Sequence, residues 1–436
     1  MKRRTVLGMS VATAAAPFLS SSALTNAPQA AATPKPAGAA IRTEHWTQAR
    51  HFAKGRRAGL KPGSGEELVL HRNRVGAGAY TDPFNKVTRS YHTGTWTSHV
   101  VELDFPGDEA VVSWNATTPT GTFIEVVFRG RKADGTWTTW YVMGRWASGN
   151  DFDGGDIHRT SVDDQNDDDA AIYTDTFSVR KAREIGAYQV RATLHDPPGW
   201  TQSPSLDAIS VMVSEYQAEQ VNPVTSARTL DEAVELAVPP FAQNTHRGDY
   251  PEFGGGGQVW CSPTSSSMVI YHWGRKVPAD ELSAISCPAG DPQVDYAAIN
   301  CWDYTYEGSG NWPFNTAYAH RFGLDAFVTR LRSLAEAERF IEAGIPLIMS
   351  LNWAEEEMPE AGYGSDGHIM VLIGFTADGD PILNDPAANS NDNVRSVYTR
   401  KNYEKVWQKA TRGVVYVYRP ANHPLPPSMP GLTRNW

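Results

Sequence analysis

A cysteine that follows a run of four glycines is the residue in this 436-residue chain best placed for covalent chemistry. Residues 254–257 are all glycine, and Cys261 follows shortly after them. Pro263 suits the first turn of a helix, because its missing N–H costs nothing there, and Gly274 marks the expected helix end. A thiol at a helix start lies near unpaired N–H groups and the positive end of the helix dipole, which favour the reactive thiolate. A buried structural cysteine would fit the same segment.

The second chemical feature is a histidine and an aspartate at the ends of two short apolar runs. His368 begins the run over residues 368–375, and Asp385 follows the run over residues 381–384. The Asp-Gly dipeptide between the runs is a strong turn signal, so we predict a β-hairpin. Pairing of the two strands would bring His368 and Asp385 to one end of the sheet, where a carboxylate could hold the imidazole in one tautomer.

These three residues supply the parts of a nucleophilic site. Cys261 would be the nucleophile, His368 the base and Asp385 the group that orients the base. Asn384 is the alternative orienting group, because a shift of one residue in the strand register would exchange it with Asp385.

The three cysteines predict one disulfide and one remaining thiol. Cys287 and Cys301 lie fourteen residues apart in a stretch that reads as a loop, and we expect a disulfide worth about 3 kcal/mol in the chain-entropy model. Cys261 is then the thiol left over. The wide spacing of Cys287 and Cys301 is unlike that of zinc ligand pairs, so no metal site and no cofactor is predicted.

The chain that must position these residues is long enough to form two domains. Its formal charge of −10 and its pI of about 5.7 argue against a nucleic-acid partner, because no dense basic patch is present.

The N-terminus is typical of an export signal over residues 1–32. Lys2-Arg3-Arg4 precedes an apolar, alanine-rich run and small residues suited to cleavage. Paired arginines favour the twin-arginine route, with ordinary secretion as the alternative. No later stretch is long and apolar enough to span a bilayer, so we expect a secreted protein with no transmembrane anchor. Residues 33–59, rich in alanine and proline at their start, are expected to form a disordered leader.

Residues 60–216 predict an all-β domain. Short segments rich in β-branched and aromatic residues, such as 98–104, 123–130 and 188–194, alternate with turn signals and leave no room for helices. This pattern is typical of a β-sandwich of the jelly-roll kind.

A polar linker is expected over residues 217–232, an α+β domain over 233–420 and a C-terminal tail over 421–436. Within the α+β domain the sequence predicts helices at 315–322 and 334–343, and strands at 346–350, 368–375, 381–384 and 413–418.

Two features of the β domain have both structural and functional interpretations. Trp137, Trp140 and Trp146 could fill the core or form a face that stacks on sugars, and we favour the core. The acidic runs at 151–156 and 163–169 could bind calcium, but neither has the spacing of an ordered calcium loop, so solvated turns are favoured.

The order of motifs resembles that of the papain-like peptidases related to the double-glycine, bacteriocin-processing peptidases, especially their secreted stand-alone relatives. A helix-borne Cys261, the Gly-His pair that opens an apolar strand and the Asn-Asp-Pro that follows the hairpin carry the resemblance, which covers roughly residues 234–420. The β domain is similar to the N-terminal region of such secreted relatives. The resemblance implies a papain-like α+β fold and a peptide or protein substrate.

It also implies an oxyanion hole made by the cysteine N–H and an upstream glutamine. A glutamine five or six residues before Cys261 is absent, since glycines occupy those places. Gln243 is the first candidate and Gln258 the second. The glycine run could let the intervening insert fold back, so that Gln243 reaches the thiol.

Together these features predict a secreted cysteine peptidase or amidohydrolase that works through a thioester. Two alternatives are a surface or carbohydrate-binding protein with an inactive papain-like domain, and a thioester acyltransferase. With any of these three functions, the β-sandwich could contact cell wall or glycan.

Overall fold

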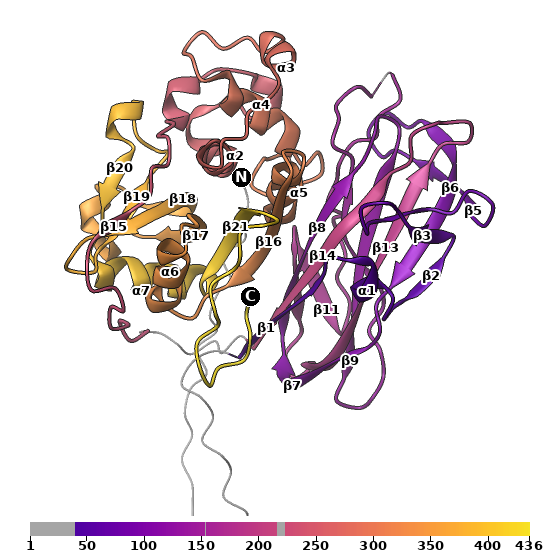
Figure 1. Ribbon diagram of the computed structural model, residues 1–436, viewed down its shortest axis with the longest axis horizontal. Coiled ribbons are helices and arrows are strands. Elements are labelled where there is room, and N and C mark those ends of the chain that lie inside the picture. The colour runs from indigo at the N-terminus through magenta and orange to yellow at the C-terminus, as the bar shows by residue number, and fades with distance from the viewer. Residues whose placement is uncertain (1–39, 153, 216–222) are drawn as a thin grey trace, which may run out of the picture. The chain divides into compact units, whose positions relative to one another are not determined.

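The computed structural model describes residues 40–436 apart from residue 153 and residues 216–222. The predicted export signal lies outside the described residues. An all-β region is followed by an α+β region, as the sequence predicted (Figure 1).

Two antiparallel sheets build the β domain. The first has the strand order β11-β12-β8-β14-β4-β3, with β1 also paired to β14. Its strands are β1 (Ile41–Trp46), β3 (Leu60–Pro62), β4 (Leu68–Leu70), β8 (Glu109–Thr117), β11 (Ala170–Tyr173), β12 (Thr176–Val179) and β14 (Ser205–Ser214).

The second sheet has the order β10-β9-β13-β6-β2, with β5 paired to β6 and β7 paired to β13. Its strands are β2 (Arg56–Ala58), β5 (Gly76–Thr81), β6 (Thr88–Thr97), β7 (Val101–Gly107), β9 (Phe123–Lys132), β10 (Tyr141–Trp146) and β13 (Ile185–Asp196). Every second side chain of β9, such as Val126 and Phe128, is fully buried. The period-two pattern therefore faces the core of a sandwich.

Residues 40–59 of the predicted leader are folded and do not form a disordered segment. Within residues 33–59, β1 pairs with β14, a short helix α1 (Ala49–Phe52) follows, and β2 pairs with β6. Ile41 and Trp46 at the ends of β1 are buried in the core. Because β1 has only six residues and its alternation of buried and partly exposed residues is broken, its sequence gives little sign of a strand.

A third antiparallel sheet forms the centre of the α+β domain, in the order β16-β21-β17-β18-β19-β20, with β15 paired to β18. Its strands are β15 (Val234–Glu235), β16 (Leu324–Arg330), β17 (Leu347–Trp353), β18 (Ser365–Phe375), β19 (Pro381–Asn384), β20 (Arg395–Val397) and β21 (Val414–Pro420). The helices are α2 (Cys261–His272), α3 (Ala279–Ser283), α4 (Pro292–Cys301), α5 (Trp312–His320), α6 (Leu334–Glu342) and α7 (Arg400–Thr411).

Helices cover both faces of this sheet (Figure 1). Ile369 and Val371 of β18 belong to the core that includes α2, α4 and α5, whereas Met370 and Leu372 belong to the core that includes α6 and α7. The continuous apolar run of β18 is explained by this two-sided burial.

The predicted disulfide between Cys287 and Cys301 is wrong, since neither cysteine is bonded in the structure. The stretch read as a loop contains α4, with Cys287 before its first turn and Cys301 as its last residue. A ten-residue helix is about 15 Å long, far beyond the Cα separation of about 7 Å that a disulfide can bridge.

Strand β8 joins the two domains, because its side chains are buried on both sides. Asn115 of β8 donates to the carbonyl oxygen of Ala326 in β16 and accepts from its N–H, at 2.8 and 3.1 Å. Arg330 of β16 forms a 2.6 Å ion pair with Glu109 of β8. The chain from Ala39 to Trp436 accordingly forms one compact unit.

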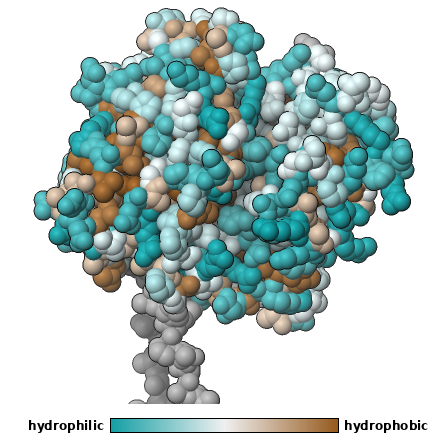
Figure 2. Space-filling view, viewed as in Figure 1, coloured by the Kyte–Doolittle hydropathy of each residue, from teal (hydrophilic) through white to brown (hydrophobic). Residues whose placement is uncertain are grey.

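Residues of the predicted linker that the structure describes, 223–232, and of the predicted tail are also packed. Thr229 donates through its N–H and hydroxyl to Glu338 of α6, and Trp436 is buried against Phe340 of the same helix. Among the described residues, no helix has the length and hydropathy needed to cross a membrane. The face shown in Figure 2 is mostly hydrophilic, with hydrophobic residues in separate groups.

Candidate active site

Cys261 is the first residue of α2 and is partly buried. The helix ends at His272, and Gly274 adopts the left-handed conformation expected just beyond a helix end, with φ of 69°. Serines on α2 fix it to the sheet: Ser262 shares a hydrogen bond with Tyr416, and Ser265 donates to the carbonyl oxygen of Ile369. The start of α2 is thereby tied to β18 beside its histidine.

His368 lies in β18 opposite Leu351 of β17 and is buried. Its Nε2 is 2.8 Å from Oδ1 of Asp385, which leaves Nδ1 for the thiol, and a hydrogen bond links His368 to Cys261. Burial alone would lower the pKa of His368, but the charge and hydrogen bond of Asp385 and the hydrogen bond with Cys261 outweigh burial and raise the pKa to about 10. The imidazole is therefore held in its charged form at neutral pH.

Strand β19 ends at Asn384, which pairs with Val371 of β18, and Asp385 is the next residue. Asn384 instead donates to the carbonyl oxygen of Val238 and does not contact the histidine. Of the two candidates, Asp385 is the one that the structure brings to His368.

Asp385 accepts four hydrogen bonds. His368 and the N–H of Ala387 bond to Oδ1, and the hydroxyls of Tyr363 and Tyr398 donate to Oδ2 at 2.7 and 2.9 Å. Burial would raise the pKa of Asp385, but the charge of His368 and these hydrogen bonds hold it below its usual value. The carboxylate is thus fixed in position and in its ionised form.

Sequence reasoning missed the aromatic residues around this pair. The rings of Trp353 and Tyr363 lie edge-on to His368, with centroids 5.8 and 6.0 Å away. Tyr363 and Tyr398 flank β18 and β20 without any motif, so no sequence signal marks them.

Gln243 lies in a short 3-10 turn, η1 (Gln243–His246), and is buried. Its N–H donates to the carbonyl oxygen of Pro386, the residue after Asp385. The side chain of Asn244 donates to the carbonyl oxygen of Ala387, so η1 is anchored on the segment that follows the carboxylate. Gln258, in the turn η3 (Gly257–Val259), is exposed.

The glycine run folds back onto η1. Glycines 254–257 all have positive φ, and a Cβ on Gly256 would lie 1.8 Å from the carbonyl oxygen of His246. Only glycine permits both this backbone conformation and this approach. The glycine run therefore packs against the end of η1, and whether Gln243 reaches the thiol stays a prediction.

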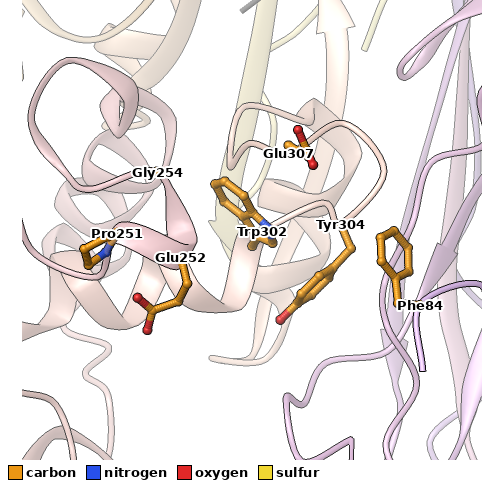
Figure 3. Close-up of a pocket in the computed structure, with 7 residues that line it drawn as sticks. All are labelled: Phe84, Pro251, Glu252, Gly254, Trp302, Tyr304 and Glu307. Carbon is orange, nitrogen blue, oxygen red and sulfur yellow. The ribbon is translucent and has the colours of Figure 1, made fainter.

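A hollow lies beside this loop (Figure 3). Phe84 of the β domain, Trp302 and Tyr304 supply aromatic rings, and Glu252 and Glu307 supply carboxylates. The catalytic candidates do not line the hollow, so it adjoins their loop and is not the reaction centre itself.

The functional alternatives in the β domain find structural explanations. The favoured core position is confirmed for Trp146, which is buried, but is wrong for Trp137 and Trp140, which are partly exposed. Their rings instead contact the guanidinium of Arg129, at 4.3 and 4.5 Å from the ring centres. In the acidic runs, Asp167 accepts from the N–H groups of residues 169 and 170, as expected of a turn.

Four side chains that could bind a metal ion also meet, away from the triad: His246, Asp249, Cys287 and Asp295. The sequence analysis predicted no metal ligands, because these residues come from separate segments.

Two family models match the chain. One, the N-terminal domain of peptidase C39, matches residues 42–214, and the other, the peptidase C39-like family, matches residues 235–415. No curated protein matches the chain.

Among solved structures, a protein from Bacillus anthracis described as a C39-like peptidase is 22% identical, with 44% of this chain and 100% of that chain covered and a TM-score of 0.28. The carbohydrate-binding module TmCBM61, in complex with β-1,4-galactotriose, is 9% identical, with 41% and 88% covered and a TM-score of 0.16. LamA from Z. galactanivorans, in complex with laminaritriose and laminaritetraose, is 10% identical, with 41% and 100% covered and a TM-score of 0.20.

With scores this low, the assignment depends on the two family models. Each matches one of the two regions described above, and both describe parts of the same kind of peptidase. The chain is therefore related to the peptidase C39 family, with the N-terminal domain of such peptidases followed by the peptidase-like domain.

Proposed function

We propose that this protein is an exported cysteine peptidase that hydrolyses amide bonds through Cys261, His368 and Asp385. The observation that carries the proposal is the buried 2.8 Å pair of His368 and Asp385, with His368 also hydrogen-bonded to the thiol at the start of α2. The relation to the C39 peptidases supports the same chemistry.

In the proposed reaction, the thiolate of Cys261, paired with the imidazolium of His368, attacks the amide carbonyl carbon. His368 gives its proton to the leaving amine as the C–N bond breaks, which leaves a thioester on Cys261. Water, deprotonated by His368, then hydrolyses the thioester and releases the carboxylate product. Asp385 stays ionised throughout and stabilises the imidazolium.

We assign the oxyanion hole to the N–H of Cys261 and the side chain of Gln243. Gln243 is favoured over the exposed Gln258, because the turn that contains Gln243 is anchored on the residues after Asp385. Loss of one such donor costs about 100- to 1,000-fold in kcat. Gln243→Ala should therefore lose most activity, whereas Gln258→Ala should retain it, and equal activities of the two variants would remove this assignment.

The hollow of Figure 3 supports a role in substrate binding, because the loop that lines it leads into Cys261. Aromatic rings with two nearby carboxylates suit a basic side chain, which could stack on a ring and pair with a carboxylate. Glu252→Gln should then raise KM for substrates with Lys or Arg while kcat stays unchanged.

We infer export from the sequence of residues 1–32, which is typical of an export signal. The protein recovered from the culture medium should begin after the alanine-rich run, as N-terminal sequencing would show. A full-length chain retained in the cytoplasm would contradict export.

The chemistry is tested with an iodoacetamide-type probe and a peptide library read by mass spectrometry. Peptide mapping should find the fast label on Cys261, and Cys261→Ala should remove both the label and hydrolysis. Cys301→Ala, which changes a thiol in the core, is the matched control and should retain both. Hydrolysis that survives Cys261→Ala would sink the mechanism, and products that carry an added amine acceptor would indicate acyl transfer.

A further inference from the structure

A cluster of four side chains lies at the end of η1. Nδ1 of His246 is 2.9 Å from Oδ2 of Asp295, 3.6 Å from Sγ of Cys287 and 3.8 Å from Oδ2 of Asp249. All four potential ligand atoms lie within 4.8 Å of one another. A nitrogen, a sulfur and two carboxylate oxygens thus converge on one point.

The four residues come from three segments that pack together. His246 ends η1 and Asp249 follows it, Cys287 lies in the loop before α4, and Asp295 is in the first turns of α4. His246 and Asp295 are fully buried, and Asp249 and Cys287 are partly buried. The cluster is therefore a built site and not a patch of solvated surface.

The charges in this cluster do not balance. Two carboxylates and a thiol face a single imidazole, and Oδ2 of Asp249 and Oδ1 of Asp295 are buried without a hydrogen-bond partner among the described residues. Buried polar atoms are normally paired, because an unpaired one costs about 1–3 kcal/mol or more if charged. A cation at the centre would satisfy both carboxylates.

We propose that His246, Asp249, Cys287 and Asp295 bind one divalent metal ion, and that this ion is Zn²⁺. Thiolate, imidazole and carboxylate are the ligands that zinc takes in proteins, in tetrahedral geometry with bonds of about 2.0–2.3 Å. Ligand atoms on such a tetrahedron are about 3.3–3.8 Å apart. The distances between the four ligand atoms in the structure would reach this range if each changed by about 1 Å at most.

Proton release accompanies binding. A cysteine binds a metal ion as its thiolate, so an ion bound to Cys287 takes the place of the thiol proton. Metal loading therefore releases the thiol proton to solvent.

Four protein ligands leave no open position, which is typical of a structural zinc site. The ion would fasten η1 to the loop before α4 and to α4 itself, which packs against α2 (Figure 1). Gln243 begins η1, and the carbonyl of His246 touches Gly256 in the loop before Cys261. The site would thus stabilise the segment that carries the proposed oxyanion donor.

The test uses the full chain with Cys261→Ala, which removes the proposed nucleophile and makes every readout independent of peptidase activity. After loading with ZnCl₂ and desalting, elemental analysis should find about one zinc per chain. Loading with Co²⁺ should give the near-ultraviolet charge-transfer absorption of a thiolate–cobalt bond. A further Cys287→Ser substitution should abolish that absorption, and Cys301→Ala, as the matched control, should keep it.

Thermal unfolding covers the case in which Cys287→Ser fails to fold. Zn²⁺ should raise the Tm of the Cys261→Ala chain by several degrees, and a chelator should reverse the shift. No bound zinc, cobalt binding without the thiolate absorption, or a Tm that is insensitive to Zn²⁺ would each overturn the proposal. Failure of the peptidase assay would leave these outcomes unaffected.

Discussion

Replacement of Asp385 by asparagine should uncouple Cys261 from His368 in a pH-dependent way. The variant keeps the size of the side chain but removes the charge that contributes most to raising the pKa of His368 to about 10. Without that charge, burial is the largest remaining influence and lowers the pKa of His368. The imidazole is then neutral at pH 7 and no longer stabilises a thiolate.

The size of the effect follows from these values. In the native protein His368, with a pKa of about 10, is charged at pH 7, and we expect this imidazolium to hold Cys261 as its thiolate. In the variant, a thiol with the ordinary pKa of about 8.5 is only a few per cent ionised at pH 7. Since only the thiolate reacts, alkylation of Cys261 should slow about 30-fold at pH 7.

The assay is the second-order rate of iodoacetamide labelling of Cys261 between pH 5 and pH 10, which needs no substrate. The native and variant rates should converge near pH 10, where any thiol is ionised. Asn384→Ala, a change at the neighbouring residue that does not contact His368, is the matched control and should follow the native profile. Equal rates at pH 7, or a reduction that is the same at every pH, would refute the ion-pair reasoning.

Three further predictions concern stability. Folding raises the pKa of His368 from 6.5 to about 10. The contribution of His368 to the free energy of unfolding should therefore be complete below about pH 6.5 and be lost as the pH rises toward 10. Asp385, whose pKa falls on folding, should lose its contribution as the pH drops below about 4, so the Tm difference between native protein and Asp385→Asn should be largest between these limits. Gly256→Ala should lower the Tm more than Gly274→Ala: both glycines have positive φ, but only at Gly256 does the added Cβ meet a backbone oxygen at 1.8 Å, and equal losses would contradict this reason. Arg330→Ala should cost about 3–5 kcal/mol in urea unfolding, because it leaves a partly buried carboxylate of the β domain unpaired, and a loss below about 1 kcal/mol would show that this ion pair does not hold the domains together.

Much of the fold could be read from local patterns. The alternation of Val126 and Phe128 with polar residues predicted strands of a sandwich, and the helix after Cys261 ended at the glycine that the pattern indicated. These predictions succeed because side-chain period and turn chemistry act over a few residues. Helix α4 was missed although Val294, Ala297, Ala298 and Cys301 recur at helical spacing, because the stretch between Cys287 and Cys301 was interpreted as a disulfide-closed loop.

The candidate site shows the same division. Cys261, His368 and Asp385 were suggested by residue type, order and a hairpin signal, each of which is local. The hydroxyls of Tyr363 and Tyr398, which fix the carboxylate, carry no motif and reach it only through packing.

The sequence by itself therefore determined the two kinds of domain, the helix that begins with Cys261 and the hairpin that carries His368. Only the tertiary structure decided that Cys287 joins His246 and not Cys301, and that β8 and β16 connect the domains. The reason is physical: secondary structure depends on neighbours along the chain, whereas these contacts join residues up to two hundred positions apart, and packing of whole elements selects them.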